Sequence, residues 1–376
     1  MSKPYIIGDC ILAPMAGITG YPFRKTALKY GASFCFTEMV SAIGYIKNDK
    51  TTLELTYSGP YTANTGIQIF GSEPNIMGLA AKKAVQSGFK AIDINFGCPA
   101  KKVVKTGAGS AALKDLDRFK AIISEVKNNI GNDNLLTIKL RSGFDESSKN
   151  YLESCKIAEN EGVDAIFFHP RTRAQMFSGK ADHSLTALLK KNISIPVYAT
   201  GDIFDIYSAK NIKESTAADG IMFARGAIGK PWIFQDFMNY SKLQSHLNKL
   251  NDADNLTSIS HLNKLNKEDN LNSISHLNKL NDADKLKNIY NLYNLNRLNR
   301  INNLNNEDKL DNVYKLMELF EDMLSFYGEK RAVNLIKPHL YNFLTGFDNA
   351  KIFRLETNNA RNYCDIINTF GKIKNI

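Results

Sequence analysis

The sequence predicts an α/β protein, in which a (β/α)8 barrel over residues 1–240 is followed by a small C-terminal all-α domain. Three observations predict this architecture. Eight short apolar runs alternate with helix-like stretches, polar groups stand at the ends of those runs, and a low-complexity insertion at residues 241–310 separates the barrel from the helical residues 311–376.

The eight apolar runs are the first of these observations. Near-continuous apolar runs that alternate with helical segments indicate a parallel sheet buried on both faces. Eight such units are typical of a (β/α)8 barrel, and a doubly wound open sheet is the alternative. The runs cover residues 11–15, 34–38, 66–70, 91–95, 136–140, 165–169, 196–200 and 220–224.

Polar side chains at the ends of these runs predict where the functional site lies. In a barrel all eight carboxyl ends of the strands open at one mouth, and active sites lie there. Core packing does not explain polar groups at so many strand ends, so we expect a site at the mouth. The end residues are Met15, Glu38, Gln68, Asn95, Lys139 with Arg141, His169 with Arg171, Thr200 with Asp202, and Arg225.

The insertion is a repeat. Near-copies of SHLNKLNDADNLTSI begin at residues 245, 260 and 275, a period of 15 residues, and an Asn- and Leu-rich stretch follows. We interpret it as low-complexity sequence, either disordered or irregularly helical. The helical part beyond it contains helix-like stretches at 313–326, 329–344 and 358–372, with basic points at Lys330, Arg331, Lys337 and His339.

Charge and cysteine content limit the class of protein. The chain of 376 residues carries 48 Lys and Arg against 38 Asp and Glu, a net charge of +10 that favours a nucleic-acid or anionic membrane partner. The alternative is a soluble protein that happens to be basic. Five scattered cysteines without a CxxC pair predict neither a disulfide framework nor a metal site. With no signal-peptide pattern and no long apolar stretch, we expect a cytoplasmic protein that does not enter membranes, and a monomer.

Cys98 is the strongest candidate for a reactive group. It stands in a Gly-Cys-Pro turn at residues 97–99, and three exposed-looking lysines follow it, Lys101, Lys102 and Lys105. A cysteine in an electropositive, exposed loop is a candidate acid or nucleophile. The alternative is a buried, inert thiol, and we expect that for Cys10, Cys35 and Cys155.

Two features predict a phosphorylated, anionic cofactor. The loops after runs seven and eight read Thr200-Gly201-Asp202 and Ala224-Arg225-Gly226, where barrels often bind phosphate. Lys139 at the mouth requires an anionic partner, since burying it unpaired is costly. A reduced flavin is one such partner, and a salt bridge to Asp93 or Glu38 is the alternative. His169, Arg171 and Arg173 add a basic cluster suited to a flavin or nucleic-acid phosphate.

At these residues the chain resembles the tRNA-dihydrouridine synthase family, closest to its bacterial B-type branch. The matching segments are LAPMAGITGYPFR (12–24), GIQIFGSEP (66–74), DINFGCPAKKVVKTGAGSAAL (93–113), TIKLRSGF (137–144), FFHPRTRAQMFSGKADH (167–183), ATGDI (199–203) and IMFARGAIGKPWIF (221–234). Weaker similarity resumes at FYGEKRAVNLIKPHL (326–340), beyond the repeat.

The resemblance implies an FMN-bound barrel, a helical tRNA-binding domain, NADPH or NADH as reductant, and Cys98 as proton donor. It implies FMN contacts at Pro14, Met15, Ala16, Gln68, Lys139, Thr200, Gly201, Asp202, Ala224 and Arg225, to which we add His169. We expect substrate contacts at Asn95, Lys101, Arg141, Arg171, Arg173, Lys330, Arg331 and Lys337. The family usually has Asn where Thr200 stands and Gly where Ala224 stands, so the amide contact at residue 200 is in question.

The implied reaction is reduction of the C5–C6 double bond of tRNA uridines. One alternative is an FMN barrel that acts on a free pyrimidine such as dihydroorotate, and another is a non-catalytic RNA-binding protein. The helical module and the charge of +10 argue against a small substrate, and the presence of Cys98 and Lys139 argues against a scaffold.

Overall fold

The computed structural model describes residues 7–241, 306–347 and 349–374. Eight parallel strands form a closed barrel in chain order, and β1 pairs with β8 to close it. The predicted barrel is therefore confirmed, and each predicted run lies on or beside one strand. The strands are β1 (Cys10–Leu12), β2 (Phe34–Ser41), β3 (Thr65–Phe70), β4 (Ala91–Phe96), β5 (Leu135–Gly143), β6 (Ala165–Thr172), β7 (Val197–Ala199) and β8 (Gly220–Phe223).

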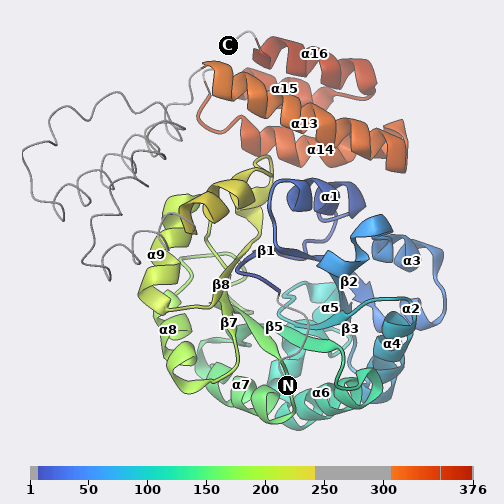
Figure 1. The fold of residues 1–376 in the computed structure, drawn as a ribbon, viewed down its shortest axis with the longest axis vertical. Helices are drawn as coiled ribbons and strands as arrows, with labels where there is room; N and C mark the ends of the chain where they lie inside the picture. Colours follow the sequence, from blue (N-terminus) through green and yellow to red (C-terminus); the bar gives the residue numbers. More distant parts are fainter. Residues whose placement is uncertain (1–6, 242–305, 348, 375–376) are drawn as a thin grey trace, which may run out of the picture.

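Helices surround the barrel (Figure 1). One example shows why they form: α6 starts where the carboxylate of Asp115 accepts the N–H of Arg118, and apolar residues at helical spacing bury one face of it. The outer helices are α1 (Tyr21–Lys29), α2 (Ala42–Ile46), α3 (Lys50–Thr56), α4 (Pro74–Gln86), α5 (Lys101–Val104), α6 (Leu116–Ile130), α7 (Tyr151–Asn160), α8 (His183–Asn192) and α9 (Ile206–Thr216).

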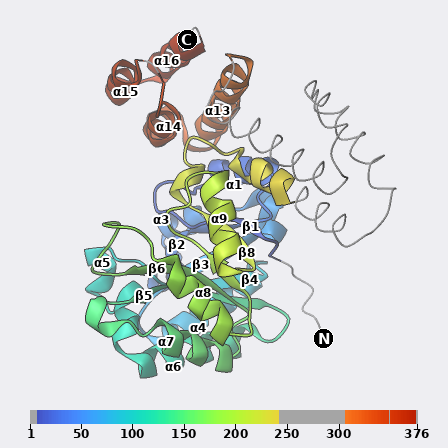
Figure 2. The same ribbon diagram turned by 90° about the vertical axis from the view of Figure 1, so that its left-hand side faces the viewer.

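Large side chains fill the end of the barrel opposite the mouth. Phe34, Phe36, Phe167, Tyr198 and Met222 are buried together, and the rings of Phe36 and Phe167 meet edge to face with their centroids 5.2 Å apart. This apolar plug leaves the polar strand ends at the opposite end, where α5 lies (Figure 2).

The helical domain contains α13 (Asn306–Tyr327), α14 (Glu329–Phe343), α15 (Ala350–Asn359) and α16 (Tyr363–Lys374). It starts five residues before the predicted boundary at 311, and most of the predicted repeat lies outside the described residues. The helical tail predicted at 358–372 is confirmed for most of its length, but it is divided between the end of α15 and α16. Ala360 leaves the helical conformation, with ψ at 132°, and the side-chain oxygen of Asn362 accepts the N–H of Asp365 at 3.0 Å where α16 starts.

The barrel and the helical domain share one apolar core. Phe23 and Ala27 of α1 and Phe237 of the barrel pack in the same buried cluster as Leu316 and Ile336 of the helical domain. In both views the helical domain lies beside α1 (Figures 1 and 2). Because the two parts bury apolar surface against each other, the position of the helical domain over the barrel is fixed by packing.

His339 completes this contact and corrects one prediction. It was expected as a basic point on the helical domain, but it is fully buried, and its Nδ1 accepts the N–H of Gly229 at 3.2 Å. Burial lowers the pKa of His339 to about 3, so the imidazole is neutral. A side chain at Gly229 would lie 2.3 Å from the carbonyl oxygen of His339, which requires glycine at that position.

Over the residues that the structure describes, no helix combines the length and the apolar character needed to cross a membrane.

Candidate functional site

The turn at residues 97–99 holds Cys98 half-buried at the mouth. The side-chain oxygen of Asn95 accepts the N–H of Gly97 at 3.1 Å and that of Cys98 at 2.8 Å. On the other side, the hydroxyl of Ser110 donates to the carbonyl of Cys98 at 2.8 Å. The turn is therefore fixed by side chains at both the N–H and the C=O of Cys98. Cys10, Cys35 and Cys155 are fully buried, as expected.

A buried hydrogen-bond chain continues from Asn95 into the barrel. Asn95 Nδ2 donates to Gln68 Oε1 at 2.8 Å, and Gln68 Nε2 donates to Asp93 Oδ2 at 2.6 Å. The hydroxyl of Thr137 donates to the other oxygen of Asp93 at 2.7 Å. Burial raises the pKa of Asp93 to about 6, although these two hydrogen bonds oppose the increase.

Lys139 stands between this chain and the basic side of the mouth. It is half-buried, and the structure places no ion pair between it and Asp93 or Glu38, the alternative that the sequence left open. Glu38 instead accepts the N–H of Gly17 at 2.5 Å. Burial, followed by repulsion from Arg141, lowers the pKa of Lys139 to about 8. A group with this environment attracts an anion placed at the mouth.

On the opposite side of the barrel mouth, Asp202 accepts several hydrogen bonds. Its two oxygens accept both terminal nitrogens of Arg171, at 2.8 and 2.6 Å, and also Arg225 at 3.2 Å and the N–H of Ala181 at 2.8 Å. Burial opposes ionisation of Asp202, but the hydrogen bond and charge of Arg171, aided by Ala181, leave its pKa below the ordinary value. The side chain of Asp202 is thus committed to protein groups, and its backbone N–H is the group that remains for a ligand.

Two of the arginines predicted as substrate contacts are buried in the protein instead. Arg141 donates to the carbonyls of Gly97, Thr172 and Met176 at 2.8–3.0 Å. Arg171 donates to Asp202 and to two carbonyls of the loop after β6. Only 3% and 1% of these side chains are exposed, so they hold the loop after β6 against the mouth. The half-buried Arg173 lies over the ring of Phe144.

His169 is not a cation either. It is buried, and burial together with the charges of Lys139, Arg141 and Arg171 holds its pKa well below the ordinary value. The expected basic cluster after run six therefore contains a neutral imidazole. Its ring lies against Gly201, where a Cβ would come within 2.6 Å of a ring carbon.

His183 and Thr19 were not among the predicted site residues. His183 Nε2 lies 2.9 Å from the carbonyl of Gly201 and so fixes the turn after β7. The hydroxyl of Thr19 accepts the N–H of Met15 at 2.8 Å and fixes the turn after β1. Both lie inside the motif segments, but their partners follow from loop conformations that periodicity does not reveal. Pro14 and Met15 are half-buried in that turn, and Ala16 is exposed.

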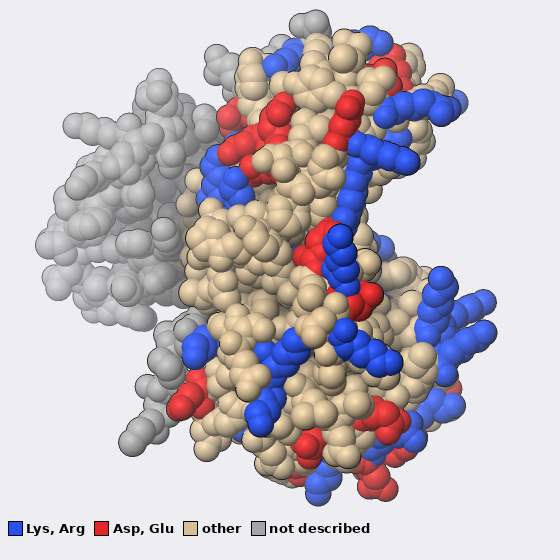
Figure 3. Space-filling model, turned by 90° about the vertical axis from the view of Figure 1, so that its right-hand side faces the viewer, with Lys and Arg blue, Asp and Glu red and all other residues tan. Residues whose placement is uncertain are grey.

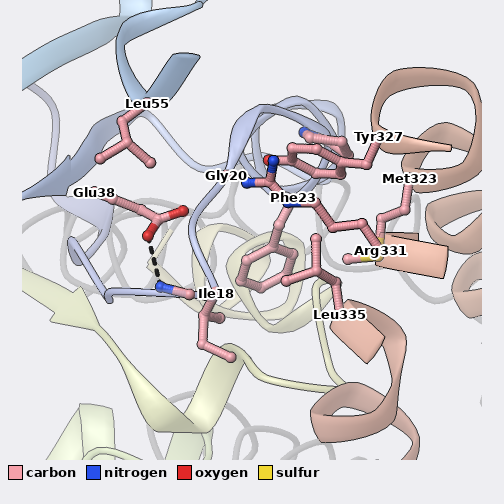
Figure 4. Close-up of a pocket in the computed structure, with 11 residues that line it drawn as sticks. Ile18, Gly20, Phe23, Glu38, Leu55, Met323, Tyr327, Arg331 and Leu335 are labelled. Carbon is pink, nitrogen blue, oxygen red and sulfur yellow. Dashed lines mark hydrogen bonds between the residues drawn. The ribbon is translucent and has the colours of Figure 1, made fainter. Parts of the chain in front are cut away.

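A small hollow of about 60 Å³ lies between the mouth and the helical domain. Figure 4 shows Glu38 and Ile18 from the barrel facing Tyr327 and Arg331 from the helical domain. Arg331, a predicted tRNA contact, pairs with Glu54 at 2.5 Å and lies over the ring of Tyr327. On the face in Figure 3, Lys and Arg side chains border the hollow region on both its barrel side and its helical side.

The remaining predicted positions lie on the surface or at the loop ends. Lys101 and Lys330 are exposed, and Lys337 is half-buried with its ammonium on the carbonyl of Asn358. Thr200 is buried, whereas Arg225 is exposed between the rings of two aromatic side chains, Phe177 and Phe204. Within the described parts of the chain, no three His, Cys, Asp or Glu side chains gather as a metal site would require.

Comparison with known proteins gives consistent matches. A model of the dihydrouridine synthase family, described as "Dihydrouridine synthase (Dus)", matches residues 11–309. The tRNA-dihydrouridine synthase B of Pseudomonas putida is 40% identical over 242 residues, which cover 64% of this chain and 70% of that protein. The Vibrio vulnificus protein of the same name is 42% identical over 231 residues, covering 61% and 71% of the two chains. Among solved structures, a 2-naphthoyl-CoA reductase complex aligns with a TM-score of 0.49 at 14% identity over 63% of this chain and 52% of that one.

Proposed function

Because the chain belongs to the dihydrouridine synthase family, we propose that it reduces the C5–C6 double bond of specific tRNA uridines, with FMN as cofactor and NADPH or NADH as reductant. It acts in the cytoplasm as a monomer. The observation that carries the proposal is Cys98, which is half-buried at the barrel mouth and fixed by Asn95 and Ser110.

The residues at the mouth fit FMN. Among the described residues, no carboxylate lies within ion-pair distance of the Lys139 ammonium, and Arg225 is exposed on the loop after β8. Backbone N–H groups at Gly201 and Asp202 lie on the turn that His183 fixes, at the place where barrels bind phosphate. Lys139 and Gln68 would hold the ring, and Arg225 the phosphate. When bound, FMN supplies the hydride that C6 of the uracil receives.

Cys98 would provide the proton for C5. Its thiol is half-buried and its backbone is held on both sides, so the sulfur keeps one position relative to the mouth. A positioned general acid contributes about 10²–10⁴-fold to a rate. Asn95, which is 8% exposed at the same strand end, would lie beside the base edge.

The tRNA would lie over the hollow between the mouth and the helical domain. The target base leaves its stack to reach the mouth. Exposed lysines on both sides suit the phosphates that flank it, with Lys101 on the barrel and Lys330 on α14. Arg331 already pairs with Glu54, so it contributes less free charge than Lys330.

The proposal is tested with purified protein and tRNA from cells that lack this gene. We expect a flavin spectrum that NADPH bleaches and tRNA restores, and a gain of two hydrogen atoms at a defined uridine by mass mapping. Cys98→Ala is the control, and it should keep the flavin but lose most of the gain. A protein that reoxidises with free uridine or dihydroorotate, and leaves tRNA unchanged, would contradict the proposed substrate.

A further inference from the structure

We propose that Asp93 is a positioning residue, which sets the direction of the hydrogen-bond chain Asp93–Gln68–Asn95 and so holds the Cys98 turn in one conformation. The part that concerns proton transfer rests on the proposed function. The part that concerns the conformation of the turn rests on the structure alone.

The chemistry of the two ends allows the hydrogen bonds of this chain to run in only one donor-to-acceptor direction. An ionised carboxylate only accepts hydrogen bonds, and a backbone N–H only donates. Asp93 at the inner end therefore requires the NH2 group of Gln68, at 2.6 Å. The N–H groups of Gly97 and Cys98 at the outer end require the oxygen of Asn95, at 3.1 and 2.8 Å.

The two amides between these ends would otherwise be free to turn over. Gln and Asn each present a donor on one side and an acceptor on the other. With Asp93 in place, Gln68 must point its oxygen toward Asn95, which then donates to it at 2.8 Å and turns its own oxygen to the Cys98 turn. The acceptor-only end and the donor-only end thus impose the same sense on both amides.

Burial makes this constraint effective. Asp93 is completely buried, Gln68 is 1% exposed and Asn95 is 8% exposed, so water does not replace a lost partner. Strand register explains the proximity, because Gln68 on β3 pairs directly with Asp93 on β4, and Asp93 pairs with Thr137 on β5. These hydrogen bonds thus link three adjacent strands to the loop that carries the Cys98 thiol.

A purely structural role for Asp93 is the competing explanation. A carboxylate that accepts only two neutral hydrogen bonds in a fully buried site is an expensive way to join strands, since burial disfavours its charge. An asparagine would join the same strands without a charge. It would also weaken the constraint on both amides, because it offers a donor as well as an acceptor and leaves only the outer N–H groups to set their direction.

The main variant is therefore Asp93→Asn, made in a Cys364→Ser background because Cys364 is the exposed cysteine among the five. We expect thermal stability equal to or above that of the parent. We also expect the rate of Cys98 alkylation by iodoacetamide, measured across pH, to change about 10-fold or more. Reoxidation of the flavin by tRNA should slow about 10- to 100-fold, the effect of losing one hydrogen bond to a charged group.

Thr137→Val is the matched control, because it removes one hydrogen bond from Asp93 and leaves the acceptor-only carboxylate in place. It should leave Cys98 alkylation near the parent value. Asn95→Asp keeps the acceptor for the Cys98 turn but cannot donate to Gln68, so it tests the chain even if Asp93→Asn does not fold. The effects of Asp93→Asn and Asn95→Asp should be non-additive in the double variant.

Parent-like alkylation and parent-like reoxidation in folded Asp93→Asn or Asn95→Asp would overturn the proposal. So would a loss of stability that accounts for the whole change in rate. If tRNA fails to reoxidise the parent enzyme, the proposed function fails, but the alkylation profile still decides the role of Asp93.

Discussion

Two carboxylates hold opposite sides of the barrel mouth, and they do so in opposite ways. Asp202 is partly exposed, accepts two arginines and one N–H, and has a lowered pKa. Asp93 is fully buried, accepts only neutral donors, and has a pKa raised to about 6. The first arrangement balances the arginine charges at the site expected to hold phosphate. The second keeps a charge where burial makes it costly, although the charge of Lys139 favours it, and our proposal gives that charge a direction-setting role.

The largest expected effect comes from removing the Cys98 thiol, which lies on the Asp93 side of the mouth. Cys98→Ala should slow reoxidation of the flavin by tRNA about 10²–10⁴-fold, the usual contribution of a general acid. Flavin binding and reduction by NADPH should be unchanged, because the Asp202 side does not touch Cys98. Stopped-flow measurement of each half-reaction checks this, and parent-rate reoxidation would shift the role of acid to another group.

Removing Asp202 should cost more stability than removing Asp93. Asp202→Ala leaves Arg171, only 1% exposed, without its carboxylate partner, and breaking a buried pair in this way costs about 3–5 kcal/mol. We expect a clear drop in the urea midpoint and weaker flavin retention. Asp133→Ala, at an exposed carboxylate, is the control and should leave both unchanged. Equal urea midpoints for Asp202→Ala and Asp133→Ala would show that the ion pair of Asp202 does not stabilise its side of the mouth.

The pH dependence of stability should also have opposite signs. Asp93 has a folded pKa of about 6, above its ordinary value of about 3.8, so the native state binds more protons between those values. Its contribution is present below about pH 4 and is lost as pH rises to about 6. Asp93→Asn should therefore gain stability relative to the parent over this interval, by about 3 kcal/mol at most.

Urea unfolding of the parent and of Asp93→Asn between pH 4 and pH 7 measures this change. Asp202 should behave in the opposite sense. Its pKa is lowered, so its contribution is present at neutral pH and is lost as the pH falls through its folded value. A difference between Asp93→Asn and its parent that does not vary with pH would show that Asp93 does not titrate in this range.

The smallest expected effect is on tRNA binding, and it comes from a lysine of the helical domain rather than from either carboxylate. Lys330→Gln on α14 should weaken tRNA binding and reduce the slope of log K against log[salt] by about 0.7–0.9, the share of one phosphate contact. The flavin spectrum should not change. Lys190→Gln is the comparison, because Lys190 pairs with Asp219 at 2.7 Å on the outside of the barrel. Indistinguishable slopes for the two variants would place the RNA surface away from Lys330.

Sequence periodicity predicted the barrel and the set of residues at its mouth, because a strand end is a local property. It did not predict the partners of those residues. Arg141 and Arg171 were expected to face a substrate, but the loop after β6 supplies carbonyls to both, and no local pattern shows that loop's path. Asp93 entered only as a possible partner for Lys139, since its link to Gln68 depends on the register between β3 and β4.

His339 is a different case, because the sequence contained the signal. It lies three residues after Ile336 and one before Leu340, on the apolar face of α14. Helical spacing therefore places it in the core, where burial outweighs the basicity that imidazole has in solution.

The apolar core shared by α1 and the helical domain has a consequence for how RNA is received. Phe23 and Ala27 pack in one cluster with Leu316 and Ile336, so the angle between the two parts is set before any ligand arrives. Such a receptor is preorganised, and little of its conformational entropy is lost when a complex forms. Under the proposed function, the entropic cost of association would then fall on the tRNA rather than on the protein.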